Sequence, residues 1–150
     1  MKRISMLSVA LCVMFLATSA FAGEKGWLTS WDEAARQSKT TGKPILMNFT
    51  GSDWCGWCIK LKKEVFTTPE FQAWAAKKVV LLEVDFPRKT QLDAKTKTQN
   101  DGLAQKYGIQ GFPTIVFANA KGEQLGTAGY EEGGPANWTK LAEQQMKKKK

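Results

Sequence analysis

The sequence predicts an α/β fold in which helices cover both faces of a mixed central β-sheet. Three nearly continuous apolar runs have the length of buried strands, at residues 45–49, 79–84 and 114–117. Segments with the i, i+3, i+4, i+7 apolar repeat of amphipathic helices separate these runs. Strands that are apolar on both sides need a layer of helices on each face, which gives the predicted architecture.

The first helix is predicted from Trp31 to Lys39, because its apolar and small residues follow the helical repeat. The turn sequence from Thr41 to Pro44 then ends it. The strand at 45–49 follows, and a loop at 50–54 leads to Cys55.

A second helix is predicted to begin at Cys55 and to end before the break at 67–70. A third helix starts there, with Thr68 as its N-cap and Pro69 in its first position. The strand at 79–84 comes next.

The segment at 86–100 is polar and basic, and we expect a loop and the start of a helix that continues to Tyr107. The strand at 114–117, a turn at 120–123 and a hairpin partner at 124–128 follow. A last helix carries the apolar stripe of Trp138, Leu141, Ala142 and Gln145.

The N-terminus has the three-part layout of a secretory signal. A basic start precedes an apolar run at 4–16, and the triplet Ala20-Phe21-Ala22 predicts cleavage after its last residue. The apolar run is shorter than the about 20 residues of a membrane-spanning helix. We therefore expect a cleaved signal at 1–22, loss of Cys12 with it, and a single domain at 23–150.

Composition excludes several kinds of chemistry. The chain contains no histidine, so Cys-His proteases, Ser-His-Asp hydrolases and histidine-ligated metal enzymes lack an essential group. The formal net charge is +8, and part of it lies in the C-terminal lysines at 147–150. Lysines at a helix end are favoured by its dipole and by solvation, so we expect no nucleic-acid partner.

The motif Cys55-Gly56-Trp57-Cys58 follows a buried strand and opens a helix. Residues at i and i+3 on a helix lie about 5–6 Å apart at Cβ, slightly wider than a disulfide prefers, so the pair forms a bridge that reopens readily. As a structural staple, a four-residue loop gains only about 2 kcal/mol in the chain-entropy model. A reversible redox pair is the better interpretation.

The helix start predicts different roles for the two thiols. Unpaired backbone N–H groups and the positive end of the dipole favour Cys55 as a thiolate, so Cys55 is the expected nucleophile. Cys58 lies one turn further in and is more shielded. We expect Cys58 to attack the mixed disulfide formed by Cys55 and release the substrate.

The residues around the two cysteines exclude some of the other functions that a cysteine pair can have. Haem attachment needs a histidine after the second cysteine, where this chain has Ile59. A structural zinc site needs four Cys or His ligands, more than residues 23–150 provide. A copper(I) ion held by two thiolates stays open as an alternative, as does a non-catalytic binding module.

These residues resemble the thioredoxin superfamily over essentially all of 23–150. Trp54-Cys55-Gly56-Trp57-Cys58 is similar to the family's active-site motif, and Gly111-Phe112-Pro113-Thr114 is similar to the turn that carries its cis-proline. The loop from Phe49 to Cys55 looks most like that of exported bacterial thioredoxin-like proteins. The resemblance implies a thioredoxin fold.

The resemblance also implies further site residues. Pro113 would be cis beside the cysteines, with its flank offering backbone hydrogen bonds to an extended substrate; an ordinary strand-start proline is the alternative. Phe112, Trp54 and Trp57 would form an apolar rim for polypeptides. Trp54 could equally belong to the core, whereas Trp57, between the cysteines beside Gly56, is expected to be exposed.

Three features depart from the family pattern. The family usually keeps a buried aspartate on the strand before the motif, and Asn48 stands in that stretch here. Because the loop is one residue longer, whether Asn48 faces the cysteines is open. Asp53 could assist through water, but capping of its loop is the stronger interpretation. The insertion at 86–100 contains basic residues that either guide an acidic partner or are simply solvated.

Together these observations predict a monomeric thiol-disulfide oxidoreductase that acts on exported protein substrates in the periplasm or outside the cell. We expect a partner that recycles the cysteine pair, no bound cofactor, no metal and, after signal cleavage, no stable membrane insertion. The direction of electron flow is open, because Gly56 and Trp57 carry no charge from which to derive it.

Overall fold

The computed structural model describes residues 26–147. The expected signal at 1–22, Cys12 and the lysines at 148–150 lie outside the described residues. Ten elements follow one another along the chain: α1 (Trp31–Thr41), β1 (Ile45–Thr50), α2 (Gly56–Leu61), the π-helical turn η1 (Lys62–Phe66), α3 (Pro69–Lys78), β2 (Val80–Asp85), α4 (Ala94–Lys106), β3 (Thr114–Ala118), β4 (Gln124–Ala128) and α5 (Gly134–Met146).

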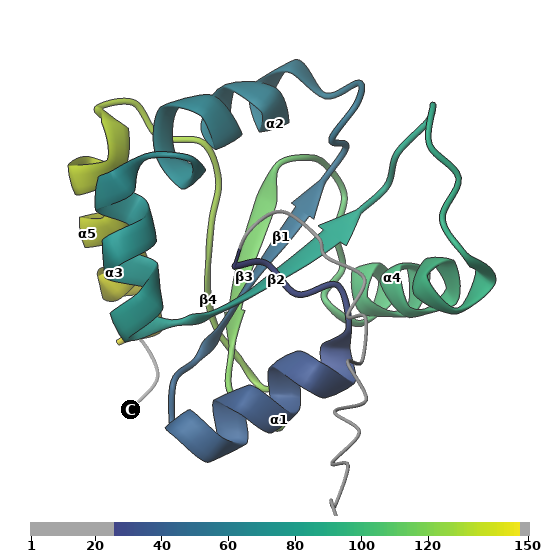
Figure 1. The fold of residues 1–150 in the computed structure, drawn as a ribbon, viewed down its shortest axis with the longest axis horizontal. Coiled ribbons are helices and arrows are strands. Elements are labelled where there is room, and N and C mark those ends of the chain that lie inside the picture. The colour runs from purple at the N-terminus through teal and green to yellow at the C-terminus, as the bar shows by residue number, and fades with distance from the viewer. Residues whose placement is uncertain (1–25, 148–150) are drawn as a thin grey trace, which may run out of the picture.

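The four strands form one mixed sheet in the order β2-β1-β3-β4. β1 runs parallel to β2 and antiparallel to β3, which in turn runs antiparallel to β4. The expected mixed sheet is thus confirmed. Since β1 and β2 are parallel, their carboxyl ends meet at the edge of the sheet where α2 begins (Figure 1).

Alternating residues of β1 divide the apolar core into two clusters, one on each face of the sheet. Leu46 packs with the residues of α2, η1, α3 and α5, whereas Met47 packs with those of α1 and α4. Figure 1 shows α3 and α5 on one side of the strands and α4 on the other. We name the side of the sheet with the Leu46 cluster the cysteine face, because α2, the helix that contains Cys58, packs in this cluster through Leu61.

The sequence explains most helix ends. Ser30 and Thr68 accept backbone N–H bonds from Glu33 and Phe71, as N-caps do. Gly42 ends α1 in the left-handed region, at φ 71°. The helix predicted to reach Tyr107 begins at Ala94, because the side chain of Asp93 accepts the Thr96 N–H.

One local feature differs from the sequence prediction. The helix that begins after Cys55 does not stay α-helical but continues through η1, in which the Thr67 N–H donates to Lys62 O. The wider turn is followed at once by the capped start of α3. Within residues 26–147, no helix is both long enough and apolar enough to span a bilayer.

Candidate active site

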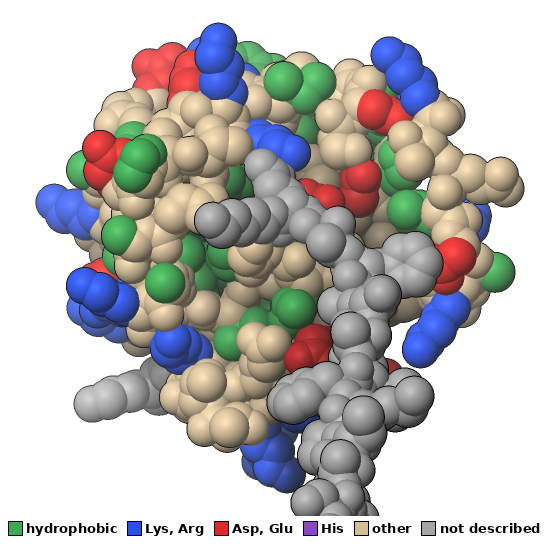
Figure 2. Space-filling model, in the orientation of Figure 1, with side chains coloured by type: hydrophobic (Ala, Val, Ile, Leu, Met, Phe, Trp, Pro, Cys, Tyr) green, Lys and Arg blue, Asp and Glu red, His purple; other side chains and the backbone are tan. Residues whose placement is uncertain are grey.

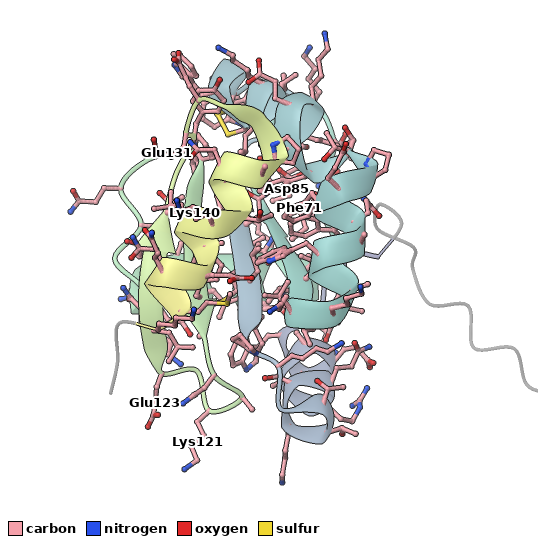
Figure 3. All side chains as sticks on the ribbon, turned by 90° about the vertical axis from the view of Figure 1, so that its left-hand side faces the viewer. Phe71, Asp85, Lys121, Glu123, Glu131 and Lys140 are labelled. Atoms are coloured by element: carbon pink, nitrogen blue, oxygen red, sulfur yellow. A yellow bond between two sulfur atoms is a disulfide. The ribbon has the colours of Figure 1, made fainter. Side chains whose placement is uncertain are left out.

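Cys55 and Cys58 form a disulfide at the start of α2, with their Cα atoms 5.2 Å apart. This separation lies in the ordinary range for disulfides. Cys55 is the N-cap residue of α2, and its sulfur accepts the Cys58 backbone N–H at 3.2 Å. Figure 3 shows the disulfide beside α2, at one end of the molecule. Both residues are more than 90% buried in this oxidised state.

The hydrogen bond to the Cys55 sulfur has a chemical consequence. A backbone N–H aimed at a sulfur stabilises the thiolate more than the neutral thiol. Cys58 places its own sulfur one turn inside the helix and contributes this N–H. The two cysteines therefore differ in position: Cys55 caps the helix and receives an N–H on its sulfur, and Cys58 lies inside the first turn.

Trp54, directly before Cys55, is held on four sides. Its indole N–H donates to Phe86 O at 2.8 Å, and the Arg88 guanidinium lies 3.8 Å from the ring centroid. Phe112 meets the ring edge-on at 5.8 Å. The ring also lies so close to Gly51 that a Cβ there would overlap it. Trp54 is thus a half-buried wall of the site, intermediate between core and rim.

Asp53 ties the active-site loop to the segment that follows β2. Its carboxylate accepts the backbone N–H groups of Arg88 and Lys89 at 2.9 and 2.7 Å, and that of Thr90 at 3.3 Å. These bonds, led by that of Arg88, hold the pKa of Asp53 below its ordinary value. The loop-capping interpretation agrees with this geometry.

Two of the four basic residues of the insertion have side-chain partners within the protein. Arg88 stacks on Trp54, and Lys97 pairs with Asp101 at 2.6 Å. A cavity of about 460 Å³ lies between the insertion and α4, lined by both acidic and basic side chains. Figure 2 shows lysine and arginine side chains scattered over one face of the molecule rather than gathered in a patch. These observations favour the solvated interpretation.

Trp57 projects from α2 with 56% of its surface exposed, as predicted. Its ring contacts Tyr130 at 5.2 Å, and Lys60 Nζ lies over both rings, 5.1 and 4.8 Å from their centroids. Tyr130 donates its hydroxyl to Glu64, a bond that raises the pKa of Tyr130. The same tyrosine raises the pKa of Lys60. Sequence reasoning missed this support, because Tyr130 lies far from the motif along the chain.

The peptide bond between Phe112 and Pro113 is cis, as the resemblance implies. Phe112 packs against Trp54 and also against Phe86, at 5.3 Å. Unlike Phe112, Gly56 is not closely packed: a Cβ built on it would meet nothing within 4 Å. Gly56 therefore lies at an exposed, uncrowded position between the two cysteines.

Asn48 lies in the middle of β1 and is 6% exposed. It shares its side of the strand with Leu46, so strand alternation directs it to the cysteine face. Its Oδ1 is buried without a hydrogen-bond partner among the described residues. No group of three or more Cys, Asp or Glu side chains within 26–147 is arranged to hold a metal ion.

Comparison with known proteins places this site in a family. The sequence model of the thioredoxin-like domain family matches residues 31–145. The disulfide bond reductase DsbH of Chlamydia pneumoniae is 39% identical over 118 residues, which cover 79% of this chain and 71% of that protein. A solved structure described as DsbH oxidoreductase superposes with a TM-score of 0.76, covering 79% of this chain and 82% of that one.

A more distant relative is much longer. The thiol:disulfide interchange protein DsbD of Klebsiella pneumoniae is 34% identical over 93 residues, which are 62% of this chain but only 14% of that protein. The fold, the bridged cysteine pair and the family match agree. The chain belongs to the thioredoxin-like domain family.

Proposed function

We propose that the protein is a thiol-disulfide oxidoreductase that reduces disulfides of exported protein substrates through Cys55 and Cys58. The observation that carries the proposal is the disulfide at the start of α2, with a backbone N–H donated to the sulfur of Cys55. The reducing direction is supported by the relative named disulfide bond reductase, which is 39% identical.

The reaction proceeds in two exchanges. The Cys55 thiolate attacks a substrate disulfide, forms a mixed disulfide and releases one substrate thiolate, which takes up a proton. Cys58 then loses its proton and attacks the Cys55 sulfur, which releases the second substrate thiol and closes the protein disulfide. Two electrons pass to the substrate, so a dithiol partner must reduce the pair again.

The substrate surface surrounds the cysteines. Trp54, Trp57 and Phe112 form its apolar rim, and the backbone beside Pro113 offers hydrogen bonds to an extended peptide. Gly56 leaves room for that peptide, while Asp53 and Asn48 support the loop and the strand beneath. Half-exposed aromatic rings supply contact area at low cost in conformational entropy.

Export follows from the N-terminal sequence. A signal at 1–22 would deliver the domain at 23–150 to the periplasm or the outside, and Dsb-type relatives suit such a destination. The copper carrier and the non-catalytic module are less well supported, because neither explains a bridged cysteine pair beside a cis-proline turn.

Reduction of insulin by dithiothreitol tests the proposal. Protein with residues 23–150 should accelerate insulin precipitation, and Cys55→Ser should abolish the acceleration. The control Gly102→Ala changes an exposed helix position away from the site and should retain the full rate. Equal rates for Cys55→Ser and the unaltered protein would contradict the proposal.

A further inference from the structure

Reduction by this site requires a group that accepts the proton of Cys58. Cys58 is 5% exposed, and burial disfavours the thiolate that must attack the mixed disulfide. Asn48 is the predicted site residue that lies on a strand of the cysteine face, and its amide does not titrate.

The register of the sheet brings a carboxylate beside Asn48. β1 and β2 are parallel, and Asn48 is directly opposite Glu83. Directly opposed residues of paired strands project from the same face of the sheet. The neighbours of Glu83 agree, because Val84 packs in the opposite cluster and Leu81 in the same cluster as Leu46. Glu83 therefore belongs to the cysteine face and is half-buried there.

Helix α2 and the turn η1 cover this part of the face. Leu61 and Val65 pack in the cluster with Leu46 and with Ile115, the β3 residue opposite Asn48. Cys58 precedes Leu61 by one helical turn, so its side chain turns toward the same strands. Asn48 and Glu83 thus lie beneath the helix that carries the resolving thiol.

The unpartnered oxygen of Asn48 supplies an independent observation. Buried polar atoms are nearly always hydrogen-bonded, and a bridging water commonly satisfies those that lack a protein partner. A water held by Asn48 Oδ1 between the thiol and the carboxylate would satisfy the amide and conduct a proton. The other charged residues of this region are Lys62 at the start of η1, four residues after Cys58, and Asp85, two residues after Glu83 on β2, whose carboxylate accepts the backbone N–H and the hydroxyl of Ser52.

We propose that Glu83 accepts the proton of Cys58 through a water held by Asn48, an inference that rests on the proposed function. In this step the Cys58 S–H bond breaks, and the proton passes to the Glu83 carboxylate. The thiolate attacks the Cys55 sulfur, the Cys55–Cys58 bond forms, and the substrate sulfur leaves with the electron pair of the mixed disulfide. A carboxylate of this kind accepts a proton through an oxygen lone pair, which the amide of Asn48 does not do at any ordinary pH.

Stopped-flow reaction of the reduced protein with an equimolar aromatic disulfide, 5,5′-dithiobis(2-nitrobenzoate), separates the two exchanges. The first release of coloured thiol reports the attack by Cys55, and the second reports the attack by Cys58. In Glu83→Gln the first phase should keep its rate, while the second should slow by about tenfold or more at pH 7. General-base catalysis contributes about 100-fold at its lower end when proton transfer alone limits the rate, and less when it limits the rate only in part. The acid inflection in the pH profile of the second phase should also disappear.

Matched variants distinguish a proton acceptor from a structural residue. Glu70→Gln makes the same charge change at an exposed position of α3 and should alter neither phase. Asn48→Asp in the Glu83→Gln background restores a carboxylate beside the original one and should recover the acid inflection. If Glu83→Gln does not fold, Asn48→Ala gives a second test, because loss of the bridging water should slow the second phase alone.

The outcomes separate the two proposals. An unaltered protein that releases only one equivalent of coloured thiol contradicts the oxidoreductase assignment itself. Two normal phases in the unaltered protein, with the same second phase and pH profile in Glu83→Gln, would overturn the role of Glu83 and leave the oxidoreductase intact.

Discussion

Replacing Gly51 by alanine perturbs the wall of the active site through one methyl group. A Cβ at this position would lie 2.6 Å from Trp54 Nε1 and 2.7 Å from Cζ2, well inside van der Waals contact. The indole cannot retreat freely, because it donates to Phe86 O and lies between Gly51 and Arg88. The ring or the loop must therefore move.

The cost is that of overpacking a fixed group, about 1–3 kcal/mol of unfolding free energy. Gly102→Ala is the matched control, because a Cβ in that part of α4 meets nothing within 4 Å. It should raise stability by up to about 1 kcal/mol, as alanine does in a helix. Both variants add one methyl group to a glycine, and the surroundings of that methyl group differ between the two positions.

Urea unfolding followed by far-UV circular dichroism measures both changes. Gly51→Ala should lower the midpoint and shift the tryptophan emission, since Trp54 loses its fixed neighbours. A Gly51→Ala protein as stable as Gly102→Ala, with unchanged emission, would refute the tight contact between Gly51 and the indole.

Three more predictions follow from other parts of the molecule. Trp138→Ala should lower the unfolding free energy by about 3–5 kcal/mol in a denaturant titration, because the residue is fully buried and donates to Gly129 O; a loss below 1 kcal/mol would contradict its place in the core. Asp53→Asn should lower the melting temperature above the unfolded-state pKa of about 3.8, and the difference should vanish as pH falls through the lower folded-state pKa; a difference that persists at the most acid pH would argue against the carboxylate's role. Trp57→Ala should reduce kcat/KM for a protein disulfide several-fold more than Ile59→Ala, an equally apolar exposed change on α2; equal effects would remove Trp57 from the substrate surface.

The strands and helices were largely predictable because their signals are local. β1 and β3 are continuous apolar runs, and the Thr68-Pro69 pair marks the start of α3 by its chemistry. The start of α4 was less visible. Its sequence has no apolar stripe, so the capping side chain of Asp93 is its main local signal.

The residues of the candidate site were likewise predictable only where their signal is local. The cysteine motif and Pro113 are readable from adjacent residues, whereas Tyr130, Arg88 and Glu83 come to the site through the loop after β4, the long insertion and the register of β2. Contacts between residues 34 to 73 positions apart leave no periodic trace in the sequence. Only the paired strands show that Glu83 stands beside Asn48.

The most direct test of the account is to trap the first exchange. Cys58→Ser should hold a disulfide-containing peptide as a stable mixed disulfide, and tryptic mass spectrometry should find that peptide on Cys55. Cys55→Ser should trap little or none, because Cys55 is the N-cap residue whose sulfur accepts a backbone N–H, whereas Cys58 lies one turn inside α2. Attachment through Cys58, or equal trapping by both variants, would contradict the division of roles between the two thiols.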